Sequence, residues 1–405
     1  MTLPNDSYDA IIIGGGPAGS SAAIHLANRG VRVLLAEQKK FPRAKLCGEF
    51  ISPECLDHFV RLGVMSQIEL AEGAAITETV FYASNGRNVS IPSQWFGGRR
   101  VAALGLSRSE MDARLLTRAR QVGVEVREET HASNLVIDSD RACGVELRSA
   151  NGDIRIEHAP ITMDATGRAR SIARRVEKND RSAKRQRQSR FVAFKAHLTG
   201  ARGAPDRCEI YVYRGGYGGL NSIENGMSNI CFIAAARDVR RLGGDAERVM
   251  REVVERNQRA RWTLANAKNV SPWLAVALDG FGRRSLVPAD GLLTIGDAAS
   301  FIDPFTGSGM LMAMESGELA AVSLTKYLPR LQHRETFQLL ANDYRASYDA
   351  RFRSRLRVSA VLRRVAFMPR IAEATIFTVG ASDRIRRRLA RSTRTHVDEI
   401  SVGVR

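Results

Sequence analysis

The chain has 405 residues, of which 44% are hydrophobic, and carries a formal net charge of +18. A chain of this size and content can bury a large core, so a disordered or fibrous protein is excluded and two closely associated domains are predicted. No apolar run approaches the roughly 18 residues of a membrane span, and no signal peptide is recognisable. The five cysteines lack metal-ligand spacing, so we expect no metal site and a reduced, cytoplasmic setting.

The amino-terminal segment combines a strand, a glycine-rich turn and a helix. Asp9–Ile13 is an apolar run typical of a buried parallel strand, and a helix is expected at about residues 20–28. The G-x-G-x-x-G spacing between them suits a phosphate: the first glycine permits a tight turn, the second leaves room for the anion and the third allows close helix packing. The residues assigned to this site are Gly14, Gly16, Pro17, Ala18 and Gly19.

A second strand and an acidic residue complete this motif. Gly30 suits the left-handed position that ends the helix, and Val31–Ala36 is expected to be the next strand. Glu37 comes directly after that strand, where a carboxylate can accept hydrogen bonds from adenosine ribose hydroxyls. A purely structural loop is the alternative, but the order strand, glycines, helix, strand, acid predicts a dinucleotide site. This motif alone does not distinguish FAD from NAD.

The middle of the chain is predicted to be rich in strands. Phe81–Ile91 is typical of a hairpin with Asn85-Gly86 as its turn. Short strands are expected at 124–126, 134–137 and 144–147. Farther on, Arg207–Arg214 and Asn229–Ala235 are predicted to flank a glycine-rich turn.

A distal segment favours FAD. Gly291–Ile295 is predicted to be a strand, and Gly296 and Asp297 come after its carboxyl end, where α/β sheets bind ligands. Asp297 can accept a hydrogen bond from a ribityl hydroxyl; a helix-capping role is the alternative. The next residues are expected to open a helix whose positive end meets the N1/C2=O edge of the isoalloxazine ring. The residues assigned to this helix start are Pro304, Gly307, Gly309 and Met310.

A third segment carries a family resemblance. Asp164-x-x-Gly167-x-x-x-Ser171 lies between the two motifs, and the three segments in this order resemble flavoproteins of the aromatic-hydroxylase fold. The resemblance implies FAD as cofactor, with Asp164 and Gly167 in its site. It also implies that Arg108, in the segment that contains Asp112, lies near the FAD pyrophosphate; an exposed helix-start arginine is the alternative.

Within that group the chain most resembles geranylgeranyl reductase-like proteins, over about residues 8–330. Lys45-Leu-Cys47-Gly48 resembles the K-x-C-G segment that this family places close to the flavin. Cys47 is therefore a candidate proton donor, with a small buried hydrophobe as the alternative. Residues 215–221 match the family's pocket strand and make Tyr217 a candidate pocket residue. Gly218 and Gly219 stand there in place of aromatic residues and Ser222 in place of proline, so a differently shaped pocket is expected.

The family layout predicts an α/β fold with a discontinuous Rossmann-like FAD-binding domain. This domain is expected to comprise residues 1–80, 100–175 and 280–330. A mostly antiparallel β-sheet substrate domain is expected at 81–99 and 176–279. Residues 331–405 are expected to form a basic helical C-terminal region.

The positive charge is concentrated in two segments. Arg168–Arg190 holds 10 Lys/Arg and 2 Asp/Glu, and Arg351–Arg405 holds 14 Arg and 4 Asp/Glu. Val358–Ile376 mixes apolar and arginine residues, as an interfacial helix at the inner face of a membrane would. The alternative is that these arginines only cover solvent-exposed helices and bind no partner. Nucleic acid is disfavoured as a partner, because the basic tail lacks interleaved aromatic residues.

The sequence therefore predicts an FAD-dependent oxidoreductase that transfers hydride to or from a carbon–carbon bond of a hydrophobic substrate, such as a prenyl, polyketide or lipid chain. NAD(P)H or a protein donor would supply electrons transiently, because no second dinucleotide motif is present. The alternative is a monooxygenase that acts through a C4a-hydroperoxyflavin. A halogenase is less favoured, since no lysine occurs between Lys45 and Lys178, and an RNA-directed flavoprotein rests on charge alone. Substrate identity, reaction direction and oligomeric state stay open.

Overall fold

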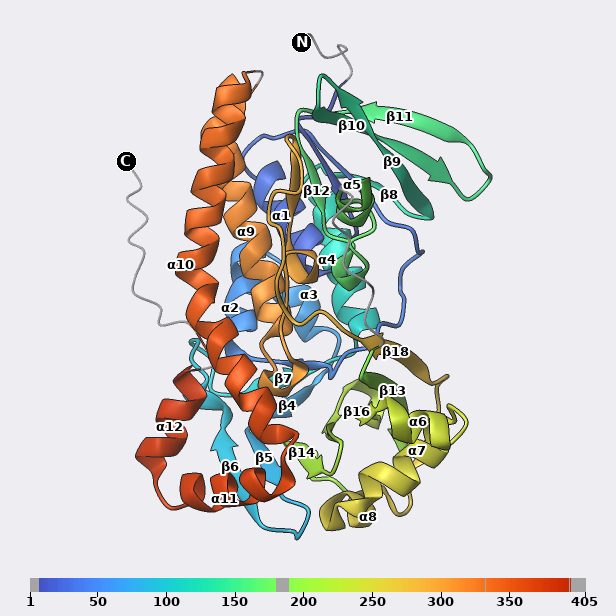
Figure 1. Cartoon of the computed structure of the whole chain (residues 1–405), viewed down its shortest axis with the longest axis vertical. Coiled ribbons are helices and arrows are strands. Elements are labelled where there is room, and N and C mark those ends of the chain that lie inside the picture. Colours follow the sequence, from blue (N-terminus) through green and yellow to red (C-terminus); the bar gives the residue numbers. More distant parts are fainter. Residues whose placement is uncertain (1–6, 180–188, 332, 393, 395–405) are drawn as a thin grey trace.

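The computed structural model describes residues 7–179, 189–331, 333–392 and 394. Parts of both basic segments, 180–188 and 395–405, lie outside this range. The chain folds as a mixed α/β structure (Figure 1). Its parallel sheet of five strands has the order β20-β12-β1-β2-β8. The strands are β1 (Ala10–Ile13), β2 (Val33–Ala36), β8 (Glu125–Arg127), β12 (Thr162–Asp164) and β20 (Leu292–Thr294).

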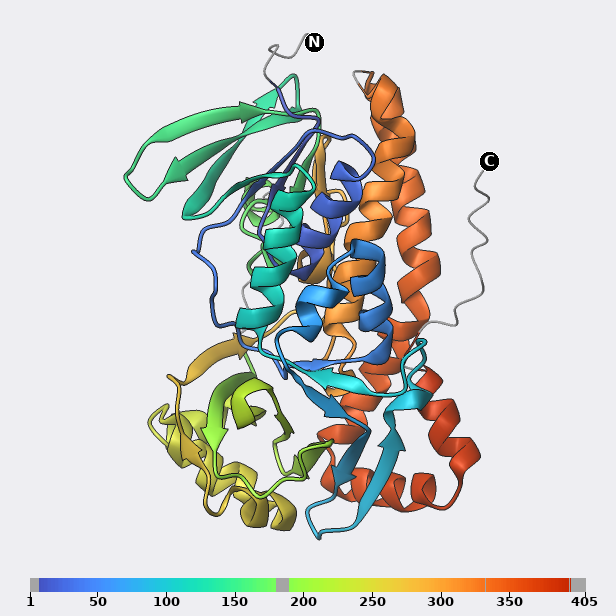
Figure 2. The same ribbon diagram turned by 180° about the vertical axis from the view of Figure 1, so that it is seen from behind.

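Helices cover one face of this sheet. The helices α1, α4 and α9 lie side by side there (Figure 2). Ile12 and Leu35 point to the helices, whereas Ile11 and Leu34 point to the opposite face, as the two-residue period of strands requires. The helices are α1 (Pro17–Ala27), α4 (Arg108–Gln121) and α9 (Gly309–Tyr327). Smaller elements nearby are α2 (Pro53–Leu62), α3 (Met65–Glu69), α5 (Ala173–Asn179), and the sheet of β3 (Phe50–Ile51), β7 (Ala103–Gly105) and β4 (Ala74–Ile76).

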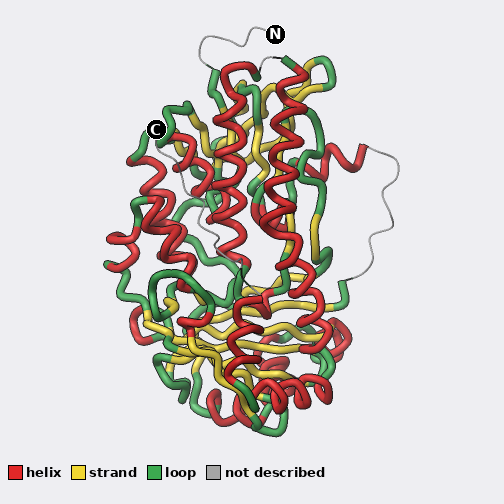
Figure 3. The backbone as a smooth tube through the Cα atoms, turned by 90° about the vertical axis from the view of Figure 1, so that its left-hand side faces the viewer, coloured by secondary structure: helices red, strands yellow, loops and turns green. Residues whose placement is uncertain are grey.

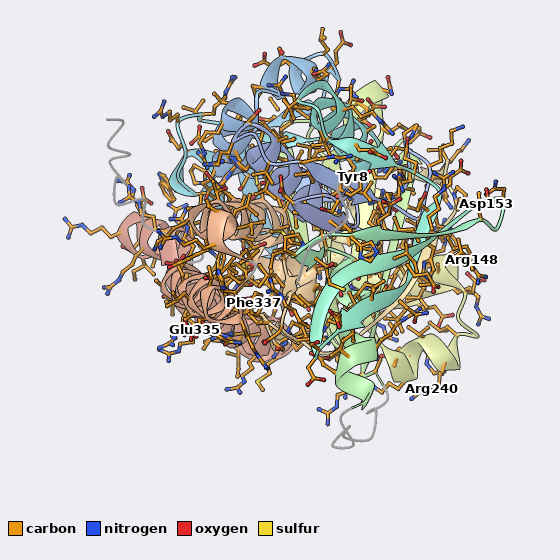
Figure 4. The ribbon with its side chains drawn as sticks, turned by 90° about the horizontal axis from the view of Figure 1, so that it is seen from above. Tyr8, Arg148, Asp153, Arg240, Glu335 and Phe337 are labelled. Carbon is orange, nitrogen blue, oxygen red and sulfur yellow. The ribbon has the colours of Figure 1, made fainter. Side chains whose placement is uncertain are left out.

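A small antiparallel sheet covers the other face. It consists of β9 (Thr130–Asp138), β10 (Arg141–Ser149) and β11 (Ile154–His158). Val145 and Leu147 pack in one hydrophobic cluster with Ile11 and Leu34. Seen from above, the far end of this sheet projects from the body of the molecule, with Arg148 and Asp153 at its edge (Figure 4). The strands expected at 134–137 and 144–147 are confirmed and are longer than expected.

A larger, mostly antiparallel sheet forms the lower half of the molecule in Figure 1. The predicted hairpin, β5 (Glu78–Tyr82) and β6 (Asn88–Pro92), joins it at one edge through a parallel pairing of β5 with β14. The glycine-rich segment expected to be a turn is instead strand β15, hydrogen-bonded between β14 and β16. Glycine is required there, since a Cβ on Gly216 would lie 1.8 Å from the Ile233 carbonyl oxygen. The remaining strands are β13 (Phe191–Thr199), β14 (Arg207–Tyr213), β15 (Gly216–Ser222), β16 (Ser228–Ala235), β17 (Lys268–Asn269) and β18 (Leu274–Leu278).

The two faces of this large sheet have different neighbours. On β13, Phe194, Ala196 and Leu198 pack against the helices α6–α8. These helices are α6 (Ala236–Arg241), α7 (Ala246–Val253) and α8 (Gln258–Leu264). The opposite face of the large sheet looks toward the half built on the parallel sheet and toward the end of the chain. A short two-stranded sheet pairs β19 (Gly282–Arg283) with β21 (Ser300–Phe301).

A long helix runs beside the half of the molecule that is built on the parallel sheet. Helix α10 (Arg334–Ala366) packs along α9 and spans the molecule from end to end (Figures 1 and 3). Arg351 and Arg355 of α10 both pair with the buried Glu315 of α9. These basic side chains therefore serve internal packing.

The last helices bring the end of the chain back to the large sheet. The helices α11 (Pro369–Gly380) and α12 (Asp383–Ser392) contact β6. Residues Val358–Ile376, considered above as an interfacial helix, do not form one continuous helix, because the chain turns at Phe367–Met368 between α10 and α11. None of the described helices combines the length and the apolar character that crossing a bilayer requires.

Candidate active site

Two close backbone approaches build the dinucleotide-binding end of the site. Gly14 has φ +110°, and a Cβ there would lie 2.5 Å from the Ala165 carbonyl oxygen. A Cβ on Gly19 would lie 1.9 Å from the Gly14 carbonyl oxygen, so only glycine lets α1 pack this closely on the turn. Gly16 differs, since the nearest atoms to its added Cβ are side-chain nitrogens of Arg108 and Arg43, at 3.8 and 3.9 Å. The turn is therefore tight at Gly14 and Gly19 and open at Gly16, as a bound phosphate requires.

Cationic groups converge on this open position. Arg108, the first residue of α4, is buried and forms a two-point ion pair with Asp112, at 2.8 and 2.7 Å. Arg43 pairs with the same carboxylate at 3.0 Å. Arg43 also lies 3.9 Å from the Glu37 carboxylate, so the two guanidinium groups beside Gly16 face two carboxylates. Burial and the neighbouring Arg43 and Arg108 lower the pKa of Lys45, which also lines the cavity. This arrangement fits a pyrophosphate.

The expected ribose ligand lies beside the glycine turn. Glu37 is buried at the end of β2, and its carboxylate accepts hydrogen bonds from the backbone N–H of Gly15 (2.8 Å) and Lys39 (2.9 Å). Pro17 and Ala18 line the same part of the cavity. Sequence reasoning missed Arg43 and the adjoining wall at Thr130–Ala132. No motif marks these residues, and only the fold brings them to the cavity.

The distal segment meets the same cavity from the other side. Asp297 lies after β20 in a short helical turn, and no donor among the described residues reaches its carboxylate. Burial raises the pKa of Asp297, while the positive charges of Arg168, Arg108 and Lys45 oppose that shift. The N-cap of α9 is Ser308, so Asp297 does not cap this helix. The free carboxylate fits a ribityl hydroxyl. Four of the expected residues at the helix start line the cavity: Pro304, Gly307, Gly309 and Met310.

Of three further residues assigned to the cofactor site, one lines the cavity and two support it from behind. The carboxylate of Asp164 accepts hydrogen bonds from the N–H groups of Thr166, Ile172 and Ala173, so it holds the loop in place and does not line the cavity. Gly296 is also outside the lining, and its Cβ would lie 2.7 Å from that of Ala18. Gly167, with φ +71°, does line it.

The cavity, about 510 Å³ in volume, continues from this polar end into an apolar chamber. One wall of the chamber is the large sheet and the other is the C-terminal helices. The sheet contributes Thr79, Phe81, Ile91, Ile210, Val212, Gly219 and Ile233. The helices contribute Leu362, Val365, Ala366, Ile376, Val379 and Leu389. Within the described residues, the lysines that line the cavity are Lys39 and Lys45, both at its polar end.

The two candidate catalytic residues lie where these halves meet. Cys47 Sγ is 4.0 Å from Met310 Sδ at the start of α9 and accepts a hydrogen bond from the N–H of Glu49. Gly48 lies beside it in the cavity lining. Tyr217 lines the chamber, but its hydroxyl donates a hydrogen bond to Asp303. Burial and that carboxylate raise the pKa of Tyr217 well above its usual value. Tyr217 is therefore a fixed wall of the chamber, whereas Cys47 faces the junction.

Comparisons with known proteins agree with this geometry. The sequence profile of the FAD binding domain family matches residues 7–329. Digeranylgeranylglycerophospholipid reductase of Methanosarcina acetivorans is 28% identical over 324 residues, which cover 78% of this chain and 74% of the relative.

Solved structures share the fold. A geranylgeranyl bacteriochlorophyll reductase-like protein from Thermoplasma acidophilum superposes with a TM-score of 0.74 at 20% identity, over 95% of this chain and 95% of the other. The flavin-dependent brominase Bmp2 gives 0.76 at 20% identity, over 95% and 93%. At these identities the structures establish the fold alone.

Bound FAD would supply hydride chemistry, and the residues that fit it are Gly16, Arg43, Arg108 and Lys45 for the pyrophosphate, Glu37 for the ribose, Asp297 for the ribityl chain and the start of α9 for the ring. The resemblance to geranylgeranyl reductase-like flavoproteins is confirmed, and the chain belongs to the FAD binding domain family as an FAD-dependent oxidoreductase.

Proposed function

We propose that this oxidoreductase transfers hydride to or from a carbon–carbon bond of a hydrophobic, lipid-like substrate. The observation that carries the proposal is the continuity of the cavity, which runs from the flavin cradle into a chamber walled by aliphatic and aromatic side chains. Apolar walls favour an apolar substrate by the hydrophobic effect. NAD(P)H is proposed as a transient reductant.

The composition of the chamber wall disfavours one of two other reactions that a flavin could carry out here. A halogenase needs a lysine near the substrate, and the apolar chamber has none among the described residues. A monooxygenase on the same cradle is the second candidate, because reduced flavin can also react with oxygen. The two differ in where the electrons of the reduced flavin go, to substrate carbon or to oxygen.

An anaerobic reoxidation experiment tests the proposal. The FAD-loaded protein is photoreduced without oxygen and mixed with geranylgeranyl phospholipids, a polyene and a menaquinone, while the flavin absorbance is monitored. Recovery of oxidised flavin together with a saturated product supports hydride transfer. Reoxidation only in air, with oxygen from labelled dioxygen in the product, contradicts it and supports the monooxygenase.

A substitution in the chamber provides the matched variant. Gly219 lies on the chamber face of β15, and the nearest atom to its added Cβ would be the side-chain tip of Ile210, at 3.0 Å. Gly219→Phe should fill the chamber, leave FAD affinity unchanged and weaken acceptor-dependent reoxidation about 10-fold or more. Unchanged reoxidation in this variant would place the substrate elsewhere.

The C-terminal helices suggest where such a substrate enters, and we propose that they rest on an anionic membrane surface. They expose large apolar side chains, namely Val361, Met368, Ile371, Phe377 and Ile385. Exposed arginines accompany them: Arg364, Arg384, Arg387, Arg388 and Arg391. Apolar groups beside cationic ones match the interface of an anionic bilayer. Other residues of the same helices line the chamber, which would place the membrane next to the substrate site.

Vesicle sedimentation tests this surface. The protein should bind vesicles that contain phosphatidylglycerol, bind neutral phosphatidylcholine vesicles less, and be released by salt. Phe377→Glu should lower the bound fraction several-fold. Leu339→Glu, on an exposed part of α10, is the control. Equal binding by both variants would contradict the proposed surface.

A further inference from the structure

Three ionisable side chains meet beneath the junction of the flavin cradle and the chamber. Glu49 is fully buried, and its Oε1 accepts a hydrogen bond from Lys195 Nζ at 2.6 Å. Its Oε2 lies 2.7 Å from His197 Nε2. Glu49 comes from the segment that contains Cys47, whereas the other two residues come from β13, far along the chain. We refer to Glu49, Lys195 and His197 as the buried relay.

The strand period explains why the relay forms. Lys195 and His197 are two residues apart, so they project from the same face of β13 as Ala193, which lines the cavity. Glu49 reaches them with φ +52°, a backbone conformation that costs a non-glycine residue about 1 kcal/mol. The backbone N–H of Arg108 donates a further hydrogen bond to Glu49, at 2.8 Å. The position of the carboxylate is thus set from three sides.

The neighbours of the relay are mostly neutral. Cys231 of β16 pairs with Lys195 in the sheet, and Asn229 pairs with His197. The Asn221 side chain of β15 donates a hydrogen bond to the Glu49 carbonyl oxygen. The backbone N–H of His197 donates one to the Ser271 hydroxyl. The Cys47 thiol is the other titratable group on this side, and the guanidinium of Arg108 is occupied by Asp112.

The charges of the relay indicate a role beyond packing. Lys195 and Glu49 already balance each other, so a simple buried ion pair would be complete without a third ionisable group. Burial raises the pKa of Glu49, but the hydrogen bond from His197 and the charge of Lys195 outweigh burial and lower it. With Glu49 ionised, the relay is neutral when His197 is neutral and carries +1 when it is protonated. Glu49 itself lines the cavity, while 14% of the His197 side chain is exposed.

We propose that the buried relay takes up one proton, through His197, when the bound flavin is reduced, and delivers it through Glu49 to the substrate carbon when the electrons leave. Negative charge gained in the cavity favours the +1 state of the relay, by Coulomb attraction in a poorly screened site. NAD(P)H supplies two electrons as hydride and solvent supplies the proton.

In the second half, hydride from the reduced flavin forms one C–H bond and the relay proton forms the other. The carbon–carbon double bond becomes single, and the flavin and relay return to their starting states. This second half rests on the proposed function, whereas the proton uptake requires only FAD.

Histidine NMR on the FAD-loaded protein tests the uptake directly. The seven histidines are ¹⁵N-labelled, and the His197→Asn variant identifies the His197 signal. Its titration midpoint should rise by about two pH units when the flavin is photoreduced, equivalent to a hundredfold change in proton affinity. Glu49→Gln should abolish this rise while FAD still binds. An unchanged midpoint in the wild-type protein would overturn the proposal.

Proton counting provides a second measurement if Glu49→Gln does not fold. At a pH midway between the two midpoints, an indicator dye in weak buffer should show close to one proton fewer taken up on flavin reduction by His197→Asn than by the wild type. The exposed His333→Asn serves as control and should match the wild type. Equal counts in all three proteins would also overturn the relay. Proton uptake by the wild type, together with failure of every carbon–carbon acceptor to reoxidise the flavin anaerobically, would retain the relay and contradict the proposed function.

Discussion

The hydroxyl of Tyr217 donates a hydrogen bond to the carboxylate of Asp303, and this contact joins the large sheet to the segment that leads into α9. The Tyr217 ring also stands edge-on to Phe305, with centroids 5.1 Å apart. Asp303 in turn accepts a hydrogen bond from the N–H of Phe305. The substrate wall and the flavin-facing helix are therefore fixed relative to one another by one buried phenol–carboxylate pair.

Removal of this hydroxyl should destabilise the fold in a pH-dependent way. Burial raises the pKa of Asp303, and the hydrogen bond from Tyr217 opposes that shift. Tyr217→Phe should raise the pKa of Asp303 further, so that the buried carboxylate becomes more costly to ionise. The loss in unfolding free energy should be about 2 kcal/mol at neutral pH and smaller in acid, where Asp303 is protonated.

Urea denaturation at pH 7 and in mild acid measures this difference. Tyr344→Phe is the control, because that buried hydroxyl donates to the neutral carbonyl of Thr294. Its cost should not depend on pH. A loss for Tyr217→Phe that is equal at both pH values would contradict the argument.

Substitution of Gly19 should lower the stability of the fold, whereas substitution of Gly16 should lower the affinity for FAD. Gly19→Ala forces a backbone clash and should cost about 3 kcal/mol or more of stability. Gly16→Val meets no protein atom at its Cβ closer than 3.8 Å, so the FAD-free protein should keep its thermal midpoint. Its FAD affinity should fall at least about 100-fold, because the side chain takes the phosphate's place. Similar thermal midpoints for the two variants would show that this distinction is wrong.

Arg108 and Arg43 both pair with Asp112 at the proposed pyrophosphate site, so removal of either positive charge should weaken FAD binding. Arg108→Gln and Arg43→Gln should each weaken FAD binding about 10- to 100-fold, the range for a lost hydrogen bond to a charged group. Flavin fluorescence titration measures this. Arg148→Gln, on the exposed face of the small sheet, should bind FAD as the wild type does. If both arginine variants bound FAD with wild-type affinity, the pyrophosphate would not bind at this position.

The buried carboxylate between α9 and α10 should dominate the stability of the C-terminal region. Glu315→Gln removes the carboxylate charge that pairs with Arg351 and Arg355 inside the fold, and should cost about 3 kcal/mol at neutral pH. Burial raises the pKa of Glu315, but Arg355 and Arg351 outweigh burial and lower it. The ion pair therefore stabilises the fold above the unfolded-state pKa, and this contribution is lost as pH falls through the lower folded-state pKa.

Chemical denaturation at several pH values from neutral to acid measures the unfolding free energies of the wild type and of Glu315→Gln. Glu247→Gln removes an exposed ion pair with Arg251 and should cost less than about 1 kcal/mol. The difference between wild type and Glu315→Gln should shrink in acid. A constant difference down to the most acid pH would mean that the carboxylate is not ionised in the folded protein.

The sequence predicted the parts of the site that local geometry determines. The spacing of Gly14, Gly16 and Gly19 is a property of one turn, and Asp297 lies just after the strand that places it. The residue pattern alone predicted a turn at β15, because glycine has low strand propensity, whereas the family resemblance already indicated a pocket strand there. Arg43 carries no motif, and its role depends on contact with Asp112.

Contacts between distant segments could not be predicted in this way. Glu49 and Lys195 are 146 positions apart, and no periodicity links them. The C-terminal helices are amphipathic, and that pattern does not say which partner covers the apolar face. In the structure part of that face closes the chamber over Phe81 and Ile210, a role that the interpretation as a purely interfacial helix did not include.

The family profile ends at residue 329, before α10 begins at Arg334. The cofactor cradle and the sheet wall of the chamber thus lie within the profile, whereas α10, α11 and α12 supply the opposite wall from beyond its end. Substitutions confined to these three helices would therefore change the volume and shape of the chamber and leave the cradle as it is.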